Sequence, residues 1–417
     1  MVKIKKINGL TLIYEKIPHV RSVSIGVWVK TGTAHENNFP KGISHFIEHM
    51  LFKGTKNRNA RDIAEELDSI GGYLNAFSSK EYTCYYARVI NEHLKIAVDV
   101  LSDITINSVF DVEEMEKEKE VVIEEIGMYE DNPDELVNDM INEIFWSEHP
   151  LGKNILGSKE SVSSITRQDV ISFVKHYYTK DNIIVSAVGN FDENNLIEII
   201  TKFFKKMPEN HGEKFEIPES FKIGKPQFIK KDIKQVHYCL AMPGPSQVDN
   251  SKYAFGILSS VIGGGMSSRL FQEIREKYGF VYTIYSYTQS HINSGMFVVY
   301  FACNEKNTDK VLELIFQELK KIKKEGITEE ELFRGKQQLK GNIILSLENT
   351  SSRMRRQASS IIYYKKLVKI DEVIKLIDSV TLDDIRRVSE KFLISKDLTW
   401  CSVGNKKAKF NIKKVDL

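Results

Sequence analysis

The chain has 417 residues, 41% of them hydrophobic and 28% charged, so we expect two or more domains with buried cores. Its 59 basic and 57 acidic residues give a net charge of only +2, which argues against nucleic acid or an anionic membrane as partner. The four cysteines are dispersed, and no segment approaches the ~18 to 20 apolar residues of a membrane span, so we expect reduced thiols and a cytoplasmic protein.

The first elements are predicted to be strands. The opening MVKIKKINGLTLIYEK has no apolar run of signal-peptide length, and residues 10–14 fit the second strand of a hairpin that turns at Asn8 and Gly9. Further strands are predicted at 83–89 and 183–188, with a helix at 92–104. Gly71 and Gly72 open another alternating strand, where a glycine pair can mark a bulge or a close approach of another backbone.

The pentapeptide at residues 45–49, HFIEH, is the most specific motif of the chain. On a helix His45, Glu48 and His49 lie within about one turn, so both imidazoles can bind one ion beside Glu48. This is the inverted HxxEH motif of zinc peptidases. Zinc with an open position can lower the pKa of a bound water toward ~7, and Glu48 could take its proton.

A five-residue motif can also occur by chance in a chain with ten histidines. Its flanks favour a real site, because Phe46, Ile47 and residues 50–52 make the helix apolar nearly all round and therefore buried. Buried polar groups need partners, and a metal would satisfy them together.

A third ligand is expected from the acidic helix predicted at 111–131, which Asp111 caps at its N-terminus. Glu118 and Glu125 are seven residues apart and therefore lie on one face of this helix. Spacing alone does not decide between Glu124 and Glu125 as the ligand.

The second half of the chain repeats the first. The strand 23–29 is echoed at 236–242, the helix from 111 at 327–332, and the end of the segment 180–190, VGN, at 403–405. The Pro-, Gly- and charge-rich stretch 206–227 separates the copies. We therefore predict an α+β fold of two homologous domains, 1–205 and 228–417, joined by a linker at 206–227. Each would be a mostly antiparallel sheet with helices on one face.

These motifs resemble the insulinase-type zinc metallopeptidases, in particular their mitochondrial-processing-peptidase-like branch. The resemblance implies two domains forming half of a clamshell, one Zn2+ per chain held by His45, His49 and Glu125, and Glu48 as general base. It implies that Glu118 is an acid needed for activity without being a ligand. It also implies that Asn75, Ala76 and Phe77 lie on an edge strand that pairs with the substrate peptide, although a purely structural hairpin fits the sequence nearly as well.

The second copy lacks HxxEH but carries Arg275 and, seven residues later, Tyr282. In the family, such a pair lies opposite the metal and helps to hold the peptide and the developing oxyanion. A surface arginine and an aromatic core residue are the structural alternative.

We therefore predict a zinc-dependent endopeptidase or oligopeptidase that acts on unstructured peptides or presequence-like segments. Longer relatives carry four such domains, so a homodimer whose active site is completed in trans is expected. The alternative is a non-catalytic scaffold or core subunit of a larger complex.

Overall fold

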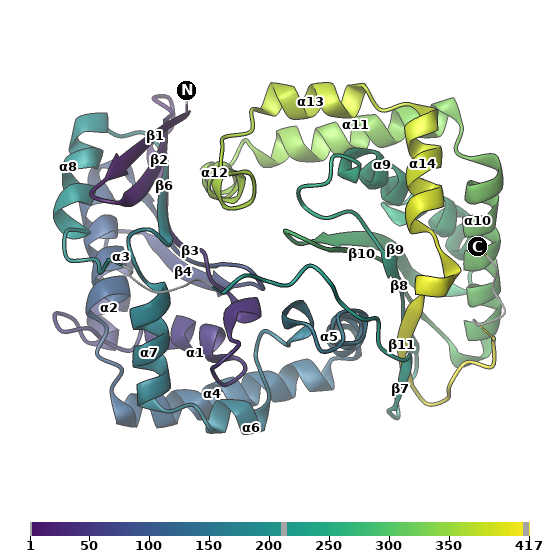
Figure 1. Ribbon diagram of the computed structural model, residues 1–417, viewed down its shortest axis with the longest axis horizontal. Helices are drawn as coiled ribbons and strands as arrows, with labels where there is room; N and C mark the ends of the chain where they lie inside the picture. The colour runs from purple at the N-terminus through teal and green to yellow at the C-terminus, as the bar shows by residue number, and fades with distance from the viewer. Residues whose placement is uncertain (1, 210–214, 412–416) are drawn as a thin grey trace. The chain divides into compact units, whose positions relative to one another are not determined.

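The computed structural model describes residues 2–209, 215–411 and 417. The chain divides into two compact units (Figure 1). The first unit comprises residues 1–128, 153–217 and 346–367, and the second comprises 129–152, 218–345 and 368–417.

The first unit is built on a six-stranded sheet with the order β1-β2-β6-β3-β5-β4. Its strands are β1 (Val2–Ile7), β2 (Leu10–Lys16), β3 (Ser22–Val29), β4 (Tyr73–Ser78), β5 (Thr83–Ile90) and β6 (Ile183–Gly189). The predicted hairpin is confirmed, because β1 and β2 pair around Asn8 and Gly9, whose φ angles of 48° and 92° suit a tight turn. All neighbours are antiparallel except β2 and β6.

The two faces of this sheet bury different side chains, because successive residues of a strand point to opposite sides. One face, with Val27 of β3, forms the main core under most of the helices. The other face, with Trp28, packs on α12 (Thr350–Tyr364) through Met354 and Ala358. The other helices of this unit are α1 (Ile43–Met50), α2 (Ala60–Asp68), α3 (Leu94–Asn107), α4 (Val112–Asp131, ending in the second unit), α6 (Lys159–Ser163), α7 (Arg167–Tyr177) and α8 (Glu193–Phe203).

The second unit repeats this topology in a five-stranded sheet with the order β7-β11-β8-β10-β9. Its strands are β7 (Gln227–Lys230), β8 (Val236–Pro243), β9 (Val281–Ser290), β10 (Gly295–Cys303) and β11 (Thr399–Gly404). Its helices are α5 (Pro133–Phe145), α9 (Lys252–Gly263), α10 (Thr308–Glu325), α11 (Glu329–Ser346, ending in the first unit), α13 (Ile370–Asp378) and α14 (Leu382–Phe392). As in the first unit, one pair of described neighbouring strands is parallel, namely β7 and β11, and the other pairs are antiparallel. The predicted duplication and the α+β class are therefore confirmed.

Among the described residues, short 3-10 turns and one π-helical turn link these elements. The 3-10 turns are Thr33–His35, Asn91–His93, Pro150–Gly152, Glu305–Asn307 and Ser395–Asp397, and the π-helical turn is Phe271–Lys277.

Each unit also contains a helix that comes from the other half of the sequence. Helix α5 packs on β8 and β11 of the second unit, whereas α12 packs on β3 and β6 of the first. Each unit is therefore discontinuous, which differs from the continuous ranges 1–205 and 228–417. It also means that each sheet has a helix on its second face, where helices on one face alone were expected.

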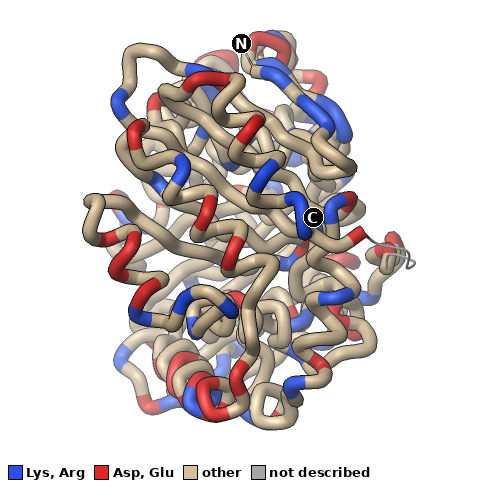
Figure 2. Tube along the Cα trace, turned by 90° about the vertical axis from the view of Figure 1, so that its left-hand side faces the viewer, with Lys and Arg blue, Asp and Glu red and all other residues tan. Residues whose placement is uncertain are grey.

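Basic and acidic residues both occur in each half of the chain, although α4 is strongly acidic. Figure 2 shows Lys and Arg interspersed with Asp and Glu along the trace, in keeping with the net charge of +2. None of the helices in the described part of the chain combines the length and apolar character needed to cross a membrane.

Candidate metal centre

Helix α1 carries the HxxEH motif and begins in a tightly packed turn. Gly42 precedes it with a φ of 85°, and a Cβ at this glycine would lie 2.4 Å from the carbonyl oxygen of Leu156. The N–H groups of Gly42 and Ser44 donate to the carboxylate of Glu36 at 2.9 and 2.8 Å. Glu36 is fully buried and satisfies the free donors at the start of the helix, which fixes the position of the motif.

The structure brings His45 and His49 of α1 together with Glu125 of α4. The two imidazole rings have centroids 4.6 Å apart, and one ligand atom from each of the three residues lies within 4.8 Å of the others. Oε2 of Glu125 is 3.8 Å from Nε2 of His45 and 3.6 Å from Nε2 of His49. Glu124, which spacing left as the alternative, is exposed.

This group of donors fits a zinc ion, because two imidazoles and a carboxylate are among its usual ligands. His45 is 7% exposed, and its Nδ1 has no hydrogen-bond partner among the described residues. Burial, and then the neighbouring His49, lower the pKa of His45 to about 3. The ring is therefore neutral near pH 7, which is the form that binds a metal.

Glu118 is not one of the three candidate ligands, but it contacts one of them, His49. Its Oε1 accepts a hydrogen bond from Nδ1 of His49 at 2.8 Å, and its Oε2 is 2.6 Å from Nζ of Lys53. Burial would raise the pKa of Glu118, but the hydrogen bonds from His49 and Lys53 outweigh it, so the net pKa is lowered. Glu118 is thus an ionised, buried carboxylate that orients the His49 ring.

Glu48 lies near His49 and Glu125, and a residue at the end of β4 holds its carboxylate. The Ser78 hydroxyl donates to Oε2 of Glu48 at 2.6 Å. Burial raises the pKa of Glu48 above its ordinary value, an effect that the hydrogen bond from Ser78 reduces. A raised carboxylate pKa brings a group closer to the range in which it can accept and return a proton.

Strand β4 forms a free edge of the first sheet beside α1, because its described pairing partner is β5 alone. The N–H of Ala76 is bonded to the side chain of Asn75 and therefore points away from β5. Asn75 is exposed, and Phe77 is partly exposed. The strand predicted for peptide pairing is therefore at an edge, with main-chain groups directed outward.

Arg275 and Tyr282 lie in the second unit and contact each other. The guanidinium carbon of Arg275 is 5.4 Å from the ring centre of Tyr282 and 4.6 Å from that of Phe271. Tyr282 is 74% exposed, so the aromatic core alternative does not apply to it.

Three supporting residues of the centre had not been identified from the sequence: Lys53, Ser78 and Glu36. Lys53 lies in the turn after α1, three residues beyond the end of the helix at Met50, so helical spacing does not account for its position. Ser78 acts from the end of β4, thirty residues from Glu48, and Glu36 acts from the turn before α1, six and eight residues from the N–H groups that it accepts from. No spacing known from the sequence would reveal either of them.

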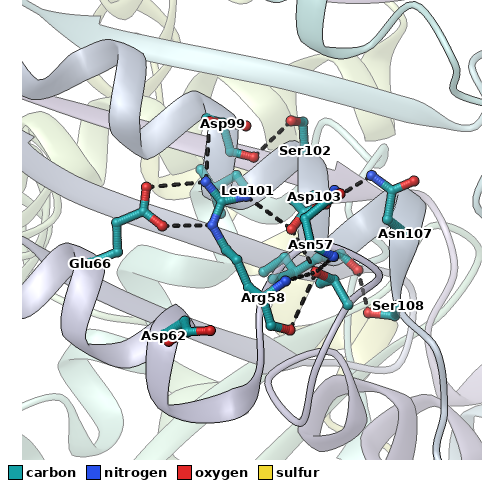
Figure 3. Close-up of polar contacts among 12 residues, drawn as sticks. Asn57, Arg58, Asp62, Glu66, Asp99, Leu101, Ser102, Asp103, Asn107 and Ser108 are labelled. Atoms are coloured by element: carbon teal, nitrogen blue, oxygen red, sulfur yellow. Dashed lines mark hydrogen bonds and ion pairs between the residues drawn. The ribbon is translucent and has the colours of Figure 1, made fainter.

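The segment that follows α1 is anchored by Arg58 (Figure 3). Its guanidinium contacts Glu66 of α2 and both Asp99 and Asp103 of α3, at 2.6 to 3.1 Å. Asp103 is buried and also accepts hydrogen bonds from Thr55 and Asn57. These contacts tie the loop after the motif to the core helix α3.

Comparison with known proteins identifies the family of this chain. The family model described as insulinase (peptidase family M16) matches residues 11–159, and the model described as peptidase M16 inactive domain matches residues 164–339. An uncharacterized zinc protease of Bacillus subtilis is 40% identical over 92% of this chain and 93% of its own length. Another, of Rickettsia felis, is 38% identical over 93% and 94%.

Solved structures share the fold over nearly the whole chain. A protease from Helicobacter pylori superposes with a TM-score of 0.88 at 22% identity, covering 97% of this chain and 99% of that one. A peptidase M16 inactive domain from Pseudomonas fluorescens reaches 0.88 at 18% identity, covering 98% and 100%. A chain of Complex III2 from Candida albicans reaches 0.84 at 19%, covering 99% and 98%. Together with the matched family models, the relatives show that this chain belongs to the insulinase family of peptidases, peptidase family M16.

Proposed function

We propose that the chain is a zinc-dependent endopeptidase or oligopeptidase that hydrolyses unstructured peptides or presequence-like segments. The observation that carries this proposal is the approach of His45, His49 and Glu125 to within 4.8 Å, with Glu48 beside them. In this proposal the two histidines and Glu125 hold one zinc ion per chain. The relatives are named uncharacterized zinc proteases, and these names support the choice of metal.

In this proposal each residue around the metal site has a separate role. When bound, zinc would supply a Lewis acid that lowers the pKa of water and polarises a carbonyl group. Glu48 accepts the proton of the attacking water and returns it to the leaving amine. Ser78 holds the Glu48 carboxylate at 2.6 Å, and Glu118 holds the ring of His49, so both groups are positioned before the substrate arrives.

The substrate would bind along β4 as an added strand. This edge is unpaired in the described part of the chain, and the Ala76 N–H points away from β5. Main-chain pairing would recognise an extended peptide with little regard to its side chains, as suits a peptidase for unstructured substrates. Asn75, Ala76 and Phe77 would form this binding strand.

Arg275 and Tyr282 would donate hydrogen bonds to the oxyanion that develops on the scissile carbonyl. We assign them to the site of a second copy in a homodimer, because one chain carries both the metal group and this pair. A mixture of a Glu48→Gln chain with an Arg275→Ala chain, each inactive alone, should regain activity when dimers re-form. Mixed dimers without activity would argue against a site completed in trans.

Zinc content and peptide cleavage together test the proposal. The purified chain should hold about one zinc per chain and cleave a mixed peptide pool, and a chelator should abolish cleavage. Glu48→Gln should keep the zinc and lose about 10²- to 10⁴-fold in rate, the usual contribution of a general base. A folded chain without zinc and without cleavage would instead favour the non-catalytic scaffold. The scaffold alternative is supported by the fold that this chain shares with a peptidase M16 inactive domain and with a chain of Complex III2.

A further inference from the structure

Helix α12 covers one face of the first sheet only in part. We call the edge of this face, which is formed by β4 and β5, the margin. Tyr73, Asn75 and Phe77 of β4 lie directly opposite Arg88, Tyr86 and Cys84 of β5. Their side chains share one face, because residues two apart in a strand point to the same side. Ser78 of β4 belongs to the opposite face, where it reaches Glu48 of α1. The metal group and this margin therefore lie on opposite faces of one edge strand.

Helix α12 is fixed over the centre of the same face. Its residues Thr350 and Ser351 hydrogen-bond to Ser24 of β3 at 2.8 and 2.9 Å. Gly26 of β3 permits this approach, since a Cβ there would lie 3.1 Å from the sulfur of Met354. The helix is thus held firmly beside the outer part of the margin, where Tyr73, Asn75 and Arg88 remain exposed.

Arg355 extends from α12 over the margin. Its guanidinium carbon lies 4.9 Å from the ring centre of Phe77 and 5.4 Å from that of Tyr86. These cation–π contacts hold the guanidinium in place while its residue remains exposed. We call Tyr73, Asn75, Phe77, Tyr86, Arg88 and Arg355 the Arg355 face.

The Arg355 face carries positive charge that is not neutralised. Neither Arg355 nor Arg88 forms an ion pair with a carboxylate among the residues that the structure describes. By contrast, Arg353 of the same helix pairs with Glu15 at 3.1 Å, and Arg58 contacts three carboxylates. An exposed guanidinium fixed on aromatic rings is suited to bind a planar carboxylate.

A peptide added to β4 would present alternate side chains to the two faces. Side chains level with Ala76 would point to the α1 side, and those level with Asn75 or Phe77 would meet the Arg355 face. We propose that the Arg355 face is a specificity subsite that binds an Asp or Glu side chain of the substrate peptide. This inference rests on the proposed function only in that the peptide lies along β4.

The test measures binding, so that it does not depend on cleavage. Fluorescent unstructured peptides would be made that are identical except for one position, which carries Glu, Gln or Lys and is moved stepwise along the peptide. Their dissociation constants for the Glu48→Gln chain would be measured by anisotropy. We expect Glu to bind about tenfold more tightly than Gln at alternate positions, and Lys more weakly than Gln.

Variants of Arg355 identify the source of the preference. In the Glu48→Gln chain, Arg355→Gln should bring the Glu-to-Gln ratio to about one, and Arg355→Lys should leave an intermediate ratio because it keeps charge without the planar fork. The matched control is Arg61→Gln, which removes an exposed guanidinium paired with Glu65 on α2 and should leave the ratio unchanged.

Two results would overturn the subsite: equal binding of the Glu and Gln peptides by the parent chain, or a preference that survives Arg355→Gln. The peptidase proposal fails on different evidence, namely absence of zinc and of cleavage in the unaltered chain. A preference that depends on Arg355 would support the subsite in either case.

Discussion

Glu118 accepts a hydrogen bond from Nδ1 of His49, and this contact decides which nitrogen of the His49 ring is available to a metal. A carboxylate can only accept, so Nδ1 carries a proton, and in the neutral ring that binds a metal Nε2 keeps its lone pair. Nε2 is the atom that lies 3.6 Å from Glu125. Lys53 holds the other oxygen of Glu118 at 2.6 Å, so the carboxylate that fixes the tautomer is itself fixed.

The first prediction concerns Glu118→Gln. An amide cannot accept from both His49 and Lys53 through two oxygens, so the orientation of the His49 ring should be lost. We expect zinc affinity to fall ~10- to 100-fold, measured by competition with a chromophoric chelator. Glu114→Gln, at a partly exposed position near the start of the same helix, should leave the affinity unchanged. Equal zinc affinity in Glu118→Gln and the unaltered chain would contradict the role of Glu118.

Two neighbouring glutamates provide a second prediction with its own control. Glu125→Gln should reduce zinc affinity by more than about 100-fold, because loss of a ligand costs more than loss of a ligand's partner. Glu124→Gln removes the same charge from the next residue, which is exposed, and should bind zinc normally. Metal analysis after dialysis compares the two. The reverse outcome would assign the ligand to Glu124.

The sequence predicted those parts of the fold that depend on local geometry. The hairpin at Asn8 and Gly9 follows from two residues that tolerate positive φ, and the helix from Val112 follows from the cap at Asp111, which accepts from Glu113 and Glu114. The exchange of α5 and α12 was not predicted. An amphipathic pattern shows that a helix must be buried, but it does not show which sheet will cover it.

The same distinction applies to the candidate site. His45, Glu48 and His49 belong to one helical turn, so their proximity could be predicted from spacing. The choice between Glu124 and Glu125 depends on how α4 is rotated against α1, which spacing does not determine. Ser78 and Arg355 act from other elements, and their roles depend on tertiary packing alone.

Arg58 supports a prediction on stability. Its side chain is 14% exposed and is paired with Asp103, which is 2% exposed (Figure 3). Arg58→Leu would leave this buried carboxylate without its cation, and we expect the free energy of unfolding to fall by about 3 kcal/mol in urea denaturation.

Two further variants test the physical reason. Adding Asp103→Asn to Arg58→Leu should recover part of the loss, since the unpaired charge is removed together with its partner. Arg61→Leu breaks an exposed pair with Glu65 and should cost less than about 1 kcal/mol. An Arg58→Leu chain as stable as the unaltered one would show that the cluster contributes no net stability.

The last prediction is a pH dependence that originates at Glu36. Burial raises the pKa of Glu36 from its ordinary value of 4.5 to about 7, although the N–H groups of Ser44 and Gly42 favour its ionised form. Between these pH values the folded chain holds a proton that the unfolded chain has released. The contribution of Glu36 to stability therefore falls as pH rises from 4.5 to about 7 and is constant above that.

Glu36→Gln removes this titration and keeps the size of the side chain. The free energy of unfolding of the unaltered chain, relative to the variant, should therefore decline by about 3 kcal/mol between pH 4.5 and 7. Burial lowers the pKa of the neighbouring His35 to about 4, which gives the opposite slope, but His35 is present in both chains and cancels in the difference. Urea denaturation at a series of pH values measures this difference, and a difference independent of pH would mean that Glu36 is ionised in the folded chain throughout this range.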